Sequence, residues 1–430
     1  MDDLSTTSLA DMCEFVIDCP HFTPKWTDSG FVVIRNQNIR DGRLNLTEPS
    51  FTHQEDFERR IKRAKPIAGD IIFTREAPMG EVCLIPEGLE CCLGQRQVLL
   101  RPKKEIDRHY LFYSLRSEYA RHQIFWNEGT GSTVSNVRIP ALKSLRIPRL
   151  GEVEGLIGAL LGALDDKIEL NRQTNETLEA LARALFKDWF VDFGPTRTKA
   201  EGGAPYLAPE LWALFPDALD DEDKPVGWES KPLSSFMSFR GGSQPPAKEF
   251  ISEPKPGYTR LLQIRDFDTD AHITYVPDST RLRKVSIDDI CIGRYGTGSG
   301  DKKDSLGRLC RGLSGAINVA LVRVEPRFPC REWLATYIGS GEFRQQISGG
   351  SARAVQAGFR KVDLDHILIP RAPDEVYQAF ETFGELVWES AKRLSAESTT
   401  LAQTRDLLLP KLMSGEIRLR DAERAVDAVL

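Results

Sequence analysis

An internal repeat organises this chain. Residues 30–148 read like residues 257–370, and each copy leads directly into a long amphipathic segment with apolar residues at heptad spacing. The prolines that end the two copies lie 222 residues apart, and Leu185 and Leu408 lie 223 residues apart, so the register continues from the globular part into the helical part. Three pairs of matching segments carry the repeat: 70–75 with 289–294, 129–132 with 349–352, and 145–148 with 367–370. We therefore expect two copies of one globular domain, each followed by a helix.

The length of 430 residues exceeds what one ordinary hydrophobic core supports and suits two domains with connecting elements. We expect an α+β fold with two similar globular domains separated by two long helices that form an antiparallel coiled coil. The expected boundaries are 1–150 for the first domain, 151–194 for the central helix, 195–225 for a linker, 226–371 for the second domain, 372–415 for the distal helix and 416–430 for a tail.

Short β-like runs alternate with turn signals in both copies, and one helix follows them in each. We expect mostly antiparallel strands with a few helices. The strands are expected at 31–34, 70–74, 81–85 and 97–100 in the first copy and at 258–264, 273–276, 289–292 and 316–322 in the second. The helices are expected at 109–115 and 332–338.

Heptads of apolar residues begin near Ile157 and Phe380, and each extends over about 35 to 40 residues, or roughly 50 to 60 Å of helix. Apolar seams with acidic flanks indicate a coiled coil, and the alternative is two ordinary amphipathic helices packed on the domains. Because the chain builds a whole domain between the two helices and then returns, we expect them to pair antiparallel. The seam residues are Leu164, Ile168, Leu178, Leu185, Leu394, Leu401 and Leu408.

Polar residues and a proline interrupt these helices. Asn171 and Asn175 either fix the register of the pair or mark a solvent-exposed break in the seam. Pro410 predicts a kink or an end near Leu409, and Ser414-Gly415 closes the helix. We expect the tail after residue 415 to be helical and dispensable.

Composition indicates a soluble cytoplasmic protein. The N-terminus carries acid where a signal peptide needs base, and no run approaches the 18 apolar residues of a membrane span. The eight cysteines form no CxxC pair and show no matched histidine spacing, so reduced and partly buried thiols are expected in place of a zinc site.

Charge is divided between the globular and helical parts, although the chain as a whole carries −6. Residues 226–371 hold 22 basic and 16 acidic side chains, and residues 96–149 hold 11 basic and 4 acidic ones. The helical segment 151–194 instead holds 4 basic and 9 acidic side chains. Cationic domains joined by anionic spacers favour a polyanionic partner, while random surface charge remains the alternative.

No common catalytic motif occurs in the chain. It lacks a GxxxxGK[ST] loop, a GxSxG turn, an HExxH helix, a methyl-donor glycine loop and an Asn-Pro-Pro-Tyr type base-binding motif. The glycine-rich run 293–300 follows a predicted strand but leads into Asp301-Lys302-Lys303-Asp304, a poor helix start, so a mobile loop or hairpin end is expected there. We expect a chain without catalytic residues, cofactor or metal.

Side chains suited to DNA recognition stand at matching places in both copies. Residues 35–40 place two arginines and three amides directly after a predicted strand, and 263–266 occupy the same place in the second copy. Arginine and amide side chains form bidentate hydrogen bonds with guanine and adenine edges. Each residue alone is better explained as a solvated surface residue, but their recurrence at matching places favours DNA binding. The expected contacts are Arg35, Asn36, Asn38, Arg40, Arg75, Gln95, Arg96, Ser132, Arg138, Gln263, Arg265, Arg294, Lys302, Ser351, Arg353 and Arg360.

Several segments resemble the specificity subunits of type I restriction-modification enzymes. The resemblance covers nearly the whole chain and is most specific in the helices. Its segments are 35–39, 69–80, 164–171, 184–190, 224–228 and 407–417. One departure concerns the second copy, which has Gly293-Arg294-Tyr295-Gly296 where the first has residues 74–78.

The resemblance implies two target-recognition domains that each read one half of a split double-stranded DNA sequence, with the paired helices setting the gap between the halves. It also implies that the helices dock two modification (methyltransferase) subunits, that the assembled complex recruits the restriction (motor-nuclease) subunits, and that the chain itself performs no chemistry. By analogy Phe186, Trp189 and Phe190 face the methyltransferase partner, or else they form intramolecular core.

A different class of function stays open at this point. The negative total charge and the aromatic helix face also suit a protein-interaction scaffold with repeated binding domains and a coiled coil. DNA retention that depends on sequence and on salt separates the two interpretations.

Overall fold

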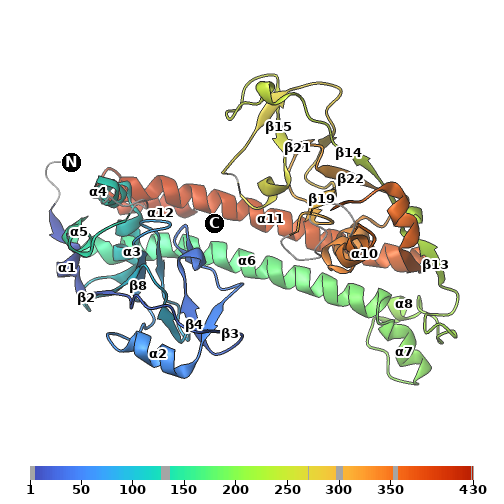
Figure 1. Ribbon diagram of the computed structural model, residues 1–430, viewed down its shortest axis with the longest axis horizontal. Coiled ribbons are helices and arrows are strands. Elements are labelled where there is room, and N and C mark those ends of the chain that lie inside the picture. The colour runs from blue at the N-terminus through green and yellow to red at the C-terminus, as the bar shows by residue number, and fades with distance from the viewer. Residues whose placement is uncertain are drawn as a thin grey trace. The chain divides into compact units, whose positions relative to one another are not determined.

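The computed structural model describes residues 5–126, 136–269, 271–296, 304–351, 357–427 and 429. Two compact units divide the chain: residues 1–171 with 395–430 form the first, and residues 172–394 form the second. Each unit therefore combines one globular copy with the parts of both long helices that lie beside it (Figure 1).

Two four-stranded sheets form the first copy. One is antiparallel, in the order β2 (Cys13–Asp18), β11 (Gln97–Pro102), β8 (Ile71–Thr74) and β9 (Val82–Leu84). The other runs in the order β10 (Cys91–Leu93), β4 (Phe31–Ile34), β7 (Ser50–Thr52) and β3 (Trp26–Thr27). In this second sheet β10 and β4 are parallel.

The second copy repeats this arrangement. Its antiparallel sheet has the order β14 (Met237–Gly241), β22 (Leu321–Pro326), β18 (Cys291–Gly293) and β20 (Leu309–Cys310). The other sheet has the order β16 (Tyr275–Pro277), β15 (Tyr258–Leu262), β21 (Gly315–Ile317) and β17 (Lys284–Val285), with β15 and β21 parallel. The predicted repeat and α+β class are confirmed, and each copy adds one parallel pair to a mainly antiparallel set.

Short elements complete both copies. In the first these are β1 (Thr6–Ser8), α1 (Leu9–Met12), β5 (Ile39–Arg40), β6 (Arg43–Leu44), α2 (Gln54–Ile61), α3 (Arg108–Arg116), α4 (Glu118–Trp126), α5 (Ile139–Ser144) and β12 (Arg146–Pro148). In the second they are β13 (Glu229–Pro232), β19 (Tyr295–Gly296), α9 (Arg331–Gly339), α10 (Glu342–Ser351), β23 (Ala357–Gly358) and β24 (Leu368–Arg371). After the first long helix, α7 (Gly194–Ala200) and α8 (Pro209–Trp212) lead toward the second copy.

The two heptad segments are the long helices α6 (Glu154–Phe190) and α11 (Asp374–Met413). In the first unit Asp165 of α6 pairs with Arg405 of α11, and the Asn171 amide donates to Glu397 Oε2 at 2.9 Å. In the second unit Phe186 of α6 lies 6.2 Å from Phe380 of α11, measured between ring centroids. Since partner numbers fall on α11 as they rise on α6, the helices pair antiparallel within each unit, as predicted.

Asn171 is 1 % exposed, so it is not a solvent-exposed break in the seam, and the alternative that it fixes the register of the pair holds for this residue. A buried amide that bonds to the facing helix disfavours shifts of register, because a shifted pair would bury the amide without its partners.

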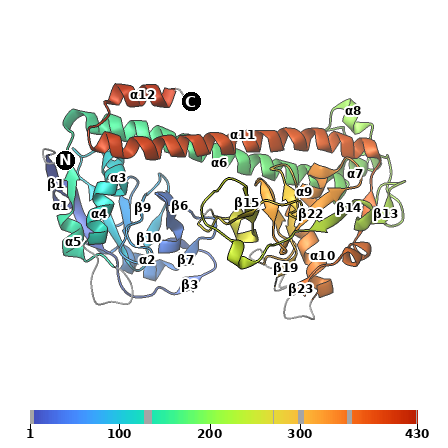
Figure 2. The ribbon, with the colours of Figure 1, turned by 90° about the horizontal axis from the view of Figure 1, so that it is seen from above.

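The end of α11 agrees with the prediction in its closure at Gly415 and in the helical tail, but the helix does not end near Leu409. The helix continues through Pro410 to Met413, and Gly415, at φ +73°, closes it. The tail then forms α12 (Leu419–Asp427), which buries Ala422 and Val426 in the core of the first unit and lies beside α11 (Figure 2). The expectation of a dispensable tail is wrong, because these side chains fill part of that core.

Each copy attaches to a long helix through the first turn of its own helix, α3 or α9. In the first copy Asp107 caps α3 and accepts the Tyr110 N–H at 2.7 Å. Gly158 of α6 faces this cap, and a Cβ at that position would lie 2.5 Å from Asp107 Oδ1. The glycine therefore leaves the space that the capped helix end occupies.

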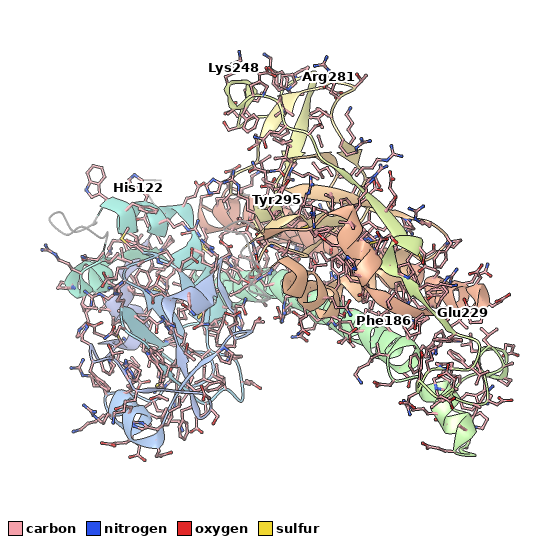
Figure 3. All side chains as sticks on the ribbon, turned by 45° about the vertical axis from the view of Figure 1, so that its right-hand side comes forward. His122, Phe186, Glu229, Lys248, Arg281 and Tyr295 are labelled. Carbon is pink, nitrogen blue, oxygen red and sulfur yellow. The ribbon has the colours of Figure 1, made fainter. Side chains whose placement is uncertain are left out.

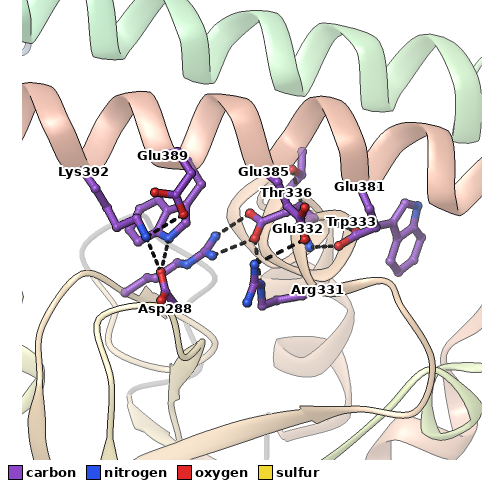
Figure 4. Close-up of polar contacts among 11 residues, drawn as sticks. Asp288, Arg331, Glu332, Trp333, Thr336, Glu381, Glu385, Glu389 and Lys392 are labelled. Carbon is purple, nitrogen blue, oxygen red and sulfur yellow. Dashed lines mark hydrogen bonds and ion pairs between the residues drawn. The ribbon is translucent and has the colours of Figure 1, made fainter.

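In the second copy the carboxylate that caps the helix N-terminus comes from the long helix instead of from the globular copy. Cys330 stands where the first copy has Asp107, and it provides no side-chain cap for α9. Glu381 of α11 stands where α6 has Gly158, and its carboxylate accepts the Glu332 and Trp333 N–H groups at 3.0 and 2.8 Å (Figure 4). Burial raises the pKa of Glu381, and the two N–H donors oppose that rise. A carboxylate thus meets the helix N-terminus in both copies, from opposite partners.

Charged groups surround the second attachment. Arg311 forms a bidentate pair with Glu332 at 2.6 and 2.7 Å, and its guanidinium lies 3.8 Å from the ring centroid of Trp388 on α11. Lys392 and Trp388 both donate to Asp288 of the second copy (Figure 4). These contacts come from one face of α11 and hold the copy against it.

We predict that Gly158→Ala destabilises the first unit even though alanine is the better helix former. The new methyl group would collide with the Asp107 carboxylate and lie 2.7 Å from the Tyr110 nitrogen. Gly162→Ala is the matched control, because the nearest atom to its Cβ would be 3.6 Å away, and it should stabilise by about 1 kcal/mol from helix propensity. Hydrogen exchange of the α3 amides measures both effects. Equal exchange rates in the two variants would contradict the close approach of Gly158 to Asp107.

We predict that Glu381→Ala costs about 1 to 3 kcal/mol, because two N–H groups of α9 lose their acceptor. Glu389→Ala on the same helix removes an exposed pair with Lys392 and should cost less than about 0.5 kcal/mol. Urea unfolding followed by tryptophan fluorescence tests this. The double variant Cys330→Asp with Glu381→Gly moves the capping carboxylate to the globular copy, so it should be more stable than Glu381→Gly alone. Equal stability of the two would contradict the idea that Asp107 and Glu381 have equivalent capping roles.

Candidate nucleic-acid interface

A 3₁₀ turn follows the equivalent strand in each copy and, with its cap, positions five of the predicted recognition residues. These turns are η1 (Asn36–Asn38) and η5 (Ile264–Phe267). Asn38 Oδ1 accepts the Arg35 N–H at 2.8 Å, and Asp266 Oδ2 accepts the Gln263 N–H at the same distance. The same backbone shape is thus built twice, with an amide in one copy and a carboxylate in the other.

Asn38 itself is used for folding. It is 4 % exposed, and its Nδ2 donates to the Asn45 carbonyl at 2.9 Å. Both ends of the Asn38 amide have partners within the chain. We therefore remove Asn38 from the expected DNA contacts, because its role is to shape the turn.

A second turn lies beside η1 and connects β10 to β11. The Gly94 N–H donates to the Ile34 carbonyl at 2.7 Å, and the Arg75 N–H donates to the Arg96 carbonyl at 2.9 Å. Arg96 has a φ of +68°, in the left-handed region, which is uncommon for a residue with a side chain. Its guanidinium is half exposed and lies 3.7 Å from Glu76.

The two turns border a cleft of about 380 Å³ in the first copy. Three arginines, Arg35, Arg60 and Arg96, line it together with the amides of Asn36, Gln37 and Gln95. Trp26 forms one wall, is 48 % exposed, and lies 5.2 Å from the Arg35 guanidinium. An exposed aromatic ring among cationic and amide side chains suits the edges and phosphates of a nucleic acid.

Arg60 supplies charge from the inner side of the cleft. It is 3 % exposed and donates to the carbonyls of Pro20 and Phe22 at 3.3 and 2.8 Å. Burial lowers the pKa of its guanidinium, but an arginine keeps its charge in proteins. Neither Arg60 nor Trp26 is among the contacts predicted from the sequence. The one sequence signal for Trp26 is its place just before Gly30, where the first copy of the repeat begins.

Other expected residues of the first copy are spread around the cleft. Gln95 donates to the His21 carbonyl, and Arg75 pairs with Asp18 at 3.0 Å. The Asn36 amide nitrogen donates to the Glu76 carbonyl. Arg40 and Arg138 are exposed, with Arg138 at the start of α5. The structure thus brings Arg35, Asn36, Gln95 and Arg96 together in the cleft.

In the second copy Arg265 and Arg360 are exposed, and Gln263 donates to Thr274 at 3.3 Å. Arg294 lies 5.2 Å from the ring of Tyr295. Figure 3 shows Lys248 and Arg281 at the tip of this copy, around β15. Ser132, Lys302 and Arg353 lie outside the described residues, as does the side chain of Ser351.

The three aromatic residues expected to face a partner are buried. Phe186, Trp189 and Phe190 are 3 %, 2 % and 6 % exposed and belong to the core of the second unit. Phe186, labelled in Figure 3, lies 5.5 Å from Trp333, and Phe190 lies 5.4 Å from Tyr377. The prediction of a partner surface is wrong for these rings, and the alternative of intramolecular core is correct, because α6 uses this face against α9 and α11.

Within the described part of the chain, no helix combines the length and the apolar character that a membrane span requires.

Comparison with known proteins shows what the chain is similar to. Residues 1–180 match the model of the type I restriction modification DNA specificity domain. This stretch is therefore similar to a type I specificity domain. The chain is 25 % identical over 369 residues to the type I restriction enzyme MjaIX specificity subunit of Methanocaldococcus jannaschii, a match that covers 82 % of this chain and 78 % of that one. It is 26 % identical over 411 residues to the HindI specificity subunit of Haemophilus influenzae, covering 81 % and 86 %.

A solved structure shares the fold. The crystal structure of the type-I restriction-modification system S subunit from M. genitalium matches with a TM-score of 0.56 and 15 % sequence identity, covering 96 % of this chain and 97 % of that one. The resemblance to type I specificity subunits is confirmed. The cleft of the first copy lies inside the stretch that matches the specificity domain.

We predict that Phe186→Ala destabilises the second unit by about 3 to 5 kcal/mol, the usual cost of deleting a buried phenylalanine ring. Leu181→Ala on the same helix serves as the control, because Leu181 is 51 % exposed and its loss should cost less than about 0.5 kcal/mol. Five of the seven tryptophans belong to the second unit, so fluorescence during urea unfolding reports on it. A loss of stability as small as that of Leu181→Ala would contradict the burial of the Phe186 ring in this core.

Proposed function

We propose that the chain is the DNA-reading subunit of a type I restriction-modification complex, and that each globular copy reads one half of a bipartite double-stranded target. The observation that carries this proposal is the cationic cleft of the first copy, built by two turns whose backbone arrangement recurs in the second copy. The family of the first 180 residues supports DNA target reading.

The physical basis of reading is a division between affinity and discrimination. Lysine and arginine contacts to phosphate release counterions and supply an affinity that falls steeply with salt. Bidentate contacts to base edges discriminate by about 1 to 3 kcal/mol each. Arg35, Arg96 and their amide neighbours fit the second role, and Arg40, Arg138, Arg265 and Arg360 fit the first, since they are exposed.

The proposal includes the partners. We propose that the paired helices, taken with the boundaries expected from the sequence, set the gap between the half-sites and dock two modification subunits, and that the complex recruits the restriction subunits. In this arrangement the chain works in the cytoplasm as a non-catalytic scaffold, and the chemistry belongs to the partner chains.

Exchange of residues 226–371 for the same domain of another specificity subunit tests the modular reading. We expect methylation of host DNA to move to a target that differs in one half only, which mapping of methylated positions reveals. A change in both halves would overturn it. DNA retention by the complex should also depend on sequence and fall with salt, whereas a protein-binding scaffold would retain no specific DNA.

A further inference from the structure

The two copies present unlike chemistry from one equivalent turn. This strand-linking turn comprises residues 94–96 between β10 and β11 in the first copy and residues 318–320 between β21 and β22 in the second. The first reads Gly-Gln-Arg and the second reads Asn-Val-Ala. A polar, cationic tip in one copy thus corresponds to an apolar tip in the other.

Matching backbone hydrogen bonds establish that the turns are equivalent. Gly94 and Asn318 donate their N–H groups to Ile34 and Leu262, the last residues of β4 and β15, at 2.7 and 3.1 Å. The residue after β8 or β18 closes the other side, since the Arg75 N–H donates to Arg96 at 2.9 Å and the Arg294 N–H donates to Ala320 at 2.8 Å. Gln95 therefore corresponds to Val319, and Arg96 corresponds to Ala320.

The difference extends to the neighbouring 3₁₀ turn. The caps Arg35–Asn38 and Gln263–Asp266 are equivalent, so Asn36 in the first copy occupies the position of Ile264 in the second. Asn36 lines the cationic cleft of the first copy, whereas Ile264 packs against the apolar cluster of the second. Together with Gln95 and Arg96 in the strand-linking turn, Asn36 makes three positions that are polar in the first copy and apolar in the second.

In the first copy the tip carries a donor that suits a base edge with acceptors. Gln95 already donates to His21 and Thr23, so Arg96 is the available donor of this turn, and its side chain is 52 % exposed. A guanidinium matches the O6 and N7 acceptors that guanine presents in the major groove.

In the second copy Val319 is 50 % exposed at the tip, and it can neither donate nor accept a hydrogen bond. Its neighbours Asn318 and Ala320 are tied into the turn, because the Ala320 N–H donates to Asn318 Oδ1 at 3.1 Å. The one apolar group that the major groove offers is the 5-methyl group of thymine.

We propose that the strand-linking turn determines which base edge each copy selects: Arg96 selects a guanine in the first half-site, and Val319 selects a thymine through its 5-methyl group in the second. This inference rests on the proposed function, because it assumes that the copies read DNA.

Base analogues in the mapped target separate the two contacts within the complex of the full chain and its modification subunits. Uracil in place of thymine removes only the methyl group, and at one position of the second half-site it should weaken binding about fourfold. The same replacement in the first half-site should change binding less than about twofold. Replacing one guanine of the first half-site with 7-deazaguanine, which lacks the N7 acceptor, should weaken binding by at least about fivefold.

Variants assign these effects to the turn. In Val319→Ala the uracil effect should disappear, whereas Val362→Ala, at another exposed valine of the same copy, should keep it. In Arg96→Ala the 7-deazaguanine effect should disappear. Both side chains are exposed, and recovery of each variant in the assembled complex shows that it folds.

Several outcomes would overturn the inference. They are a second half-site without a T·A pair, a first half-site without a G·C pair, and analogue effects that persist in Val319→Ala or Arg96→Ala. Each of these leaves specific DNA binding intact. Loss of the proposed function has a different signature, because the wild-type complex would then retain no DNA in a sequence-dependent manner.

Discussion

The structure depends on how a buried helix N-terminus obtains a carboxylate. The first N–H groups of α3 and α9 have no acceptor within their own helices, and both helix ends pack against a long helix. In the first copy Asp107 of the globular part accepts a hydrogen bond from α3, and Gly158 of α6 leaves room for its carboxylate. In the second copy Glu381 of the long helix accepts the hydrogen bonds from α9, because the globular part has Cys330 at the capping position. Because one acid serves each joint, a hydrogen-bonded helix end helps to fix the orientation of each copy on its long helix.

This exchange shows how two copies of one fold diverge without losing their shape. The backbone hydrogen bonds of the recognition turns agree between copies within a few tenths of an ångström, while the side chains on those turns differ in charge and polarity. Residues that shape the turns, such as Asn38 and Asp266, are buried. Residues at the tips, such as Arg96 and Val319, are exposed. Framework and readout are thus carried by different side chains of the same short segments.

Much of the fold was predictable from local pattern. Apolar runs at 31–34 and 97–100 form β4 and part of β11, and the heptads from Ile157 and Phe380 form α6 and α11, because periodicity reports which face of an element is buried. The parallel pairing of β10 with β4 was not predictable, since it depends on where a strand returns after several intervening elements.

The site was predictable only in part. Composition pointed to the segment 35–40, but it could not show that Asn38 turns inward or that Trp26 stays exposed. The same limit explains Phe186, because an aromatic helix face looks alike whether it covers its own domain or a partner.

The packing of α12 has a consequence for how the chain is made. The first unit joins residues 1–171 to residues 395–430, whereas the second unit is one continuous stretch between them. On a ribosome, the second unit is complete before the C-terminal part of α11 and α12 emerge, and the first unit must wait for Ala422 and Val426 to close its core. The first copy to be synthesised is therefore the last to be finished, and a chain interrupted before residue 395 leaves that copy with an open apolar face.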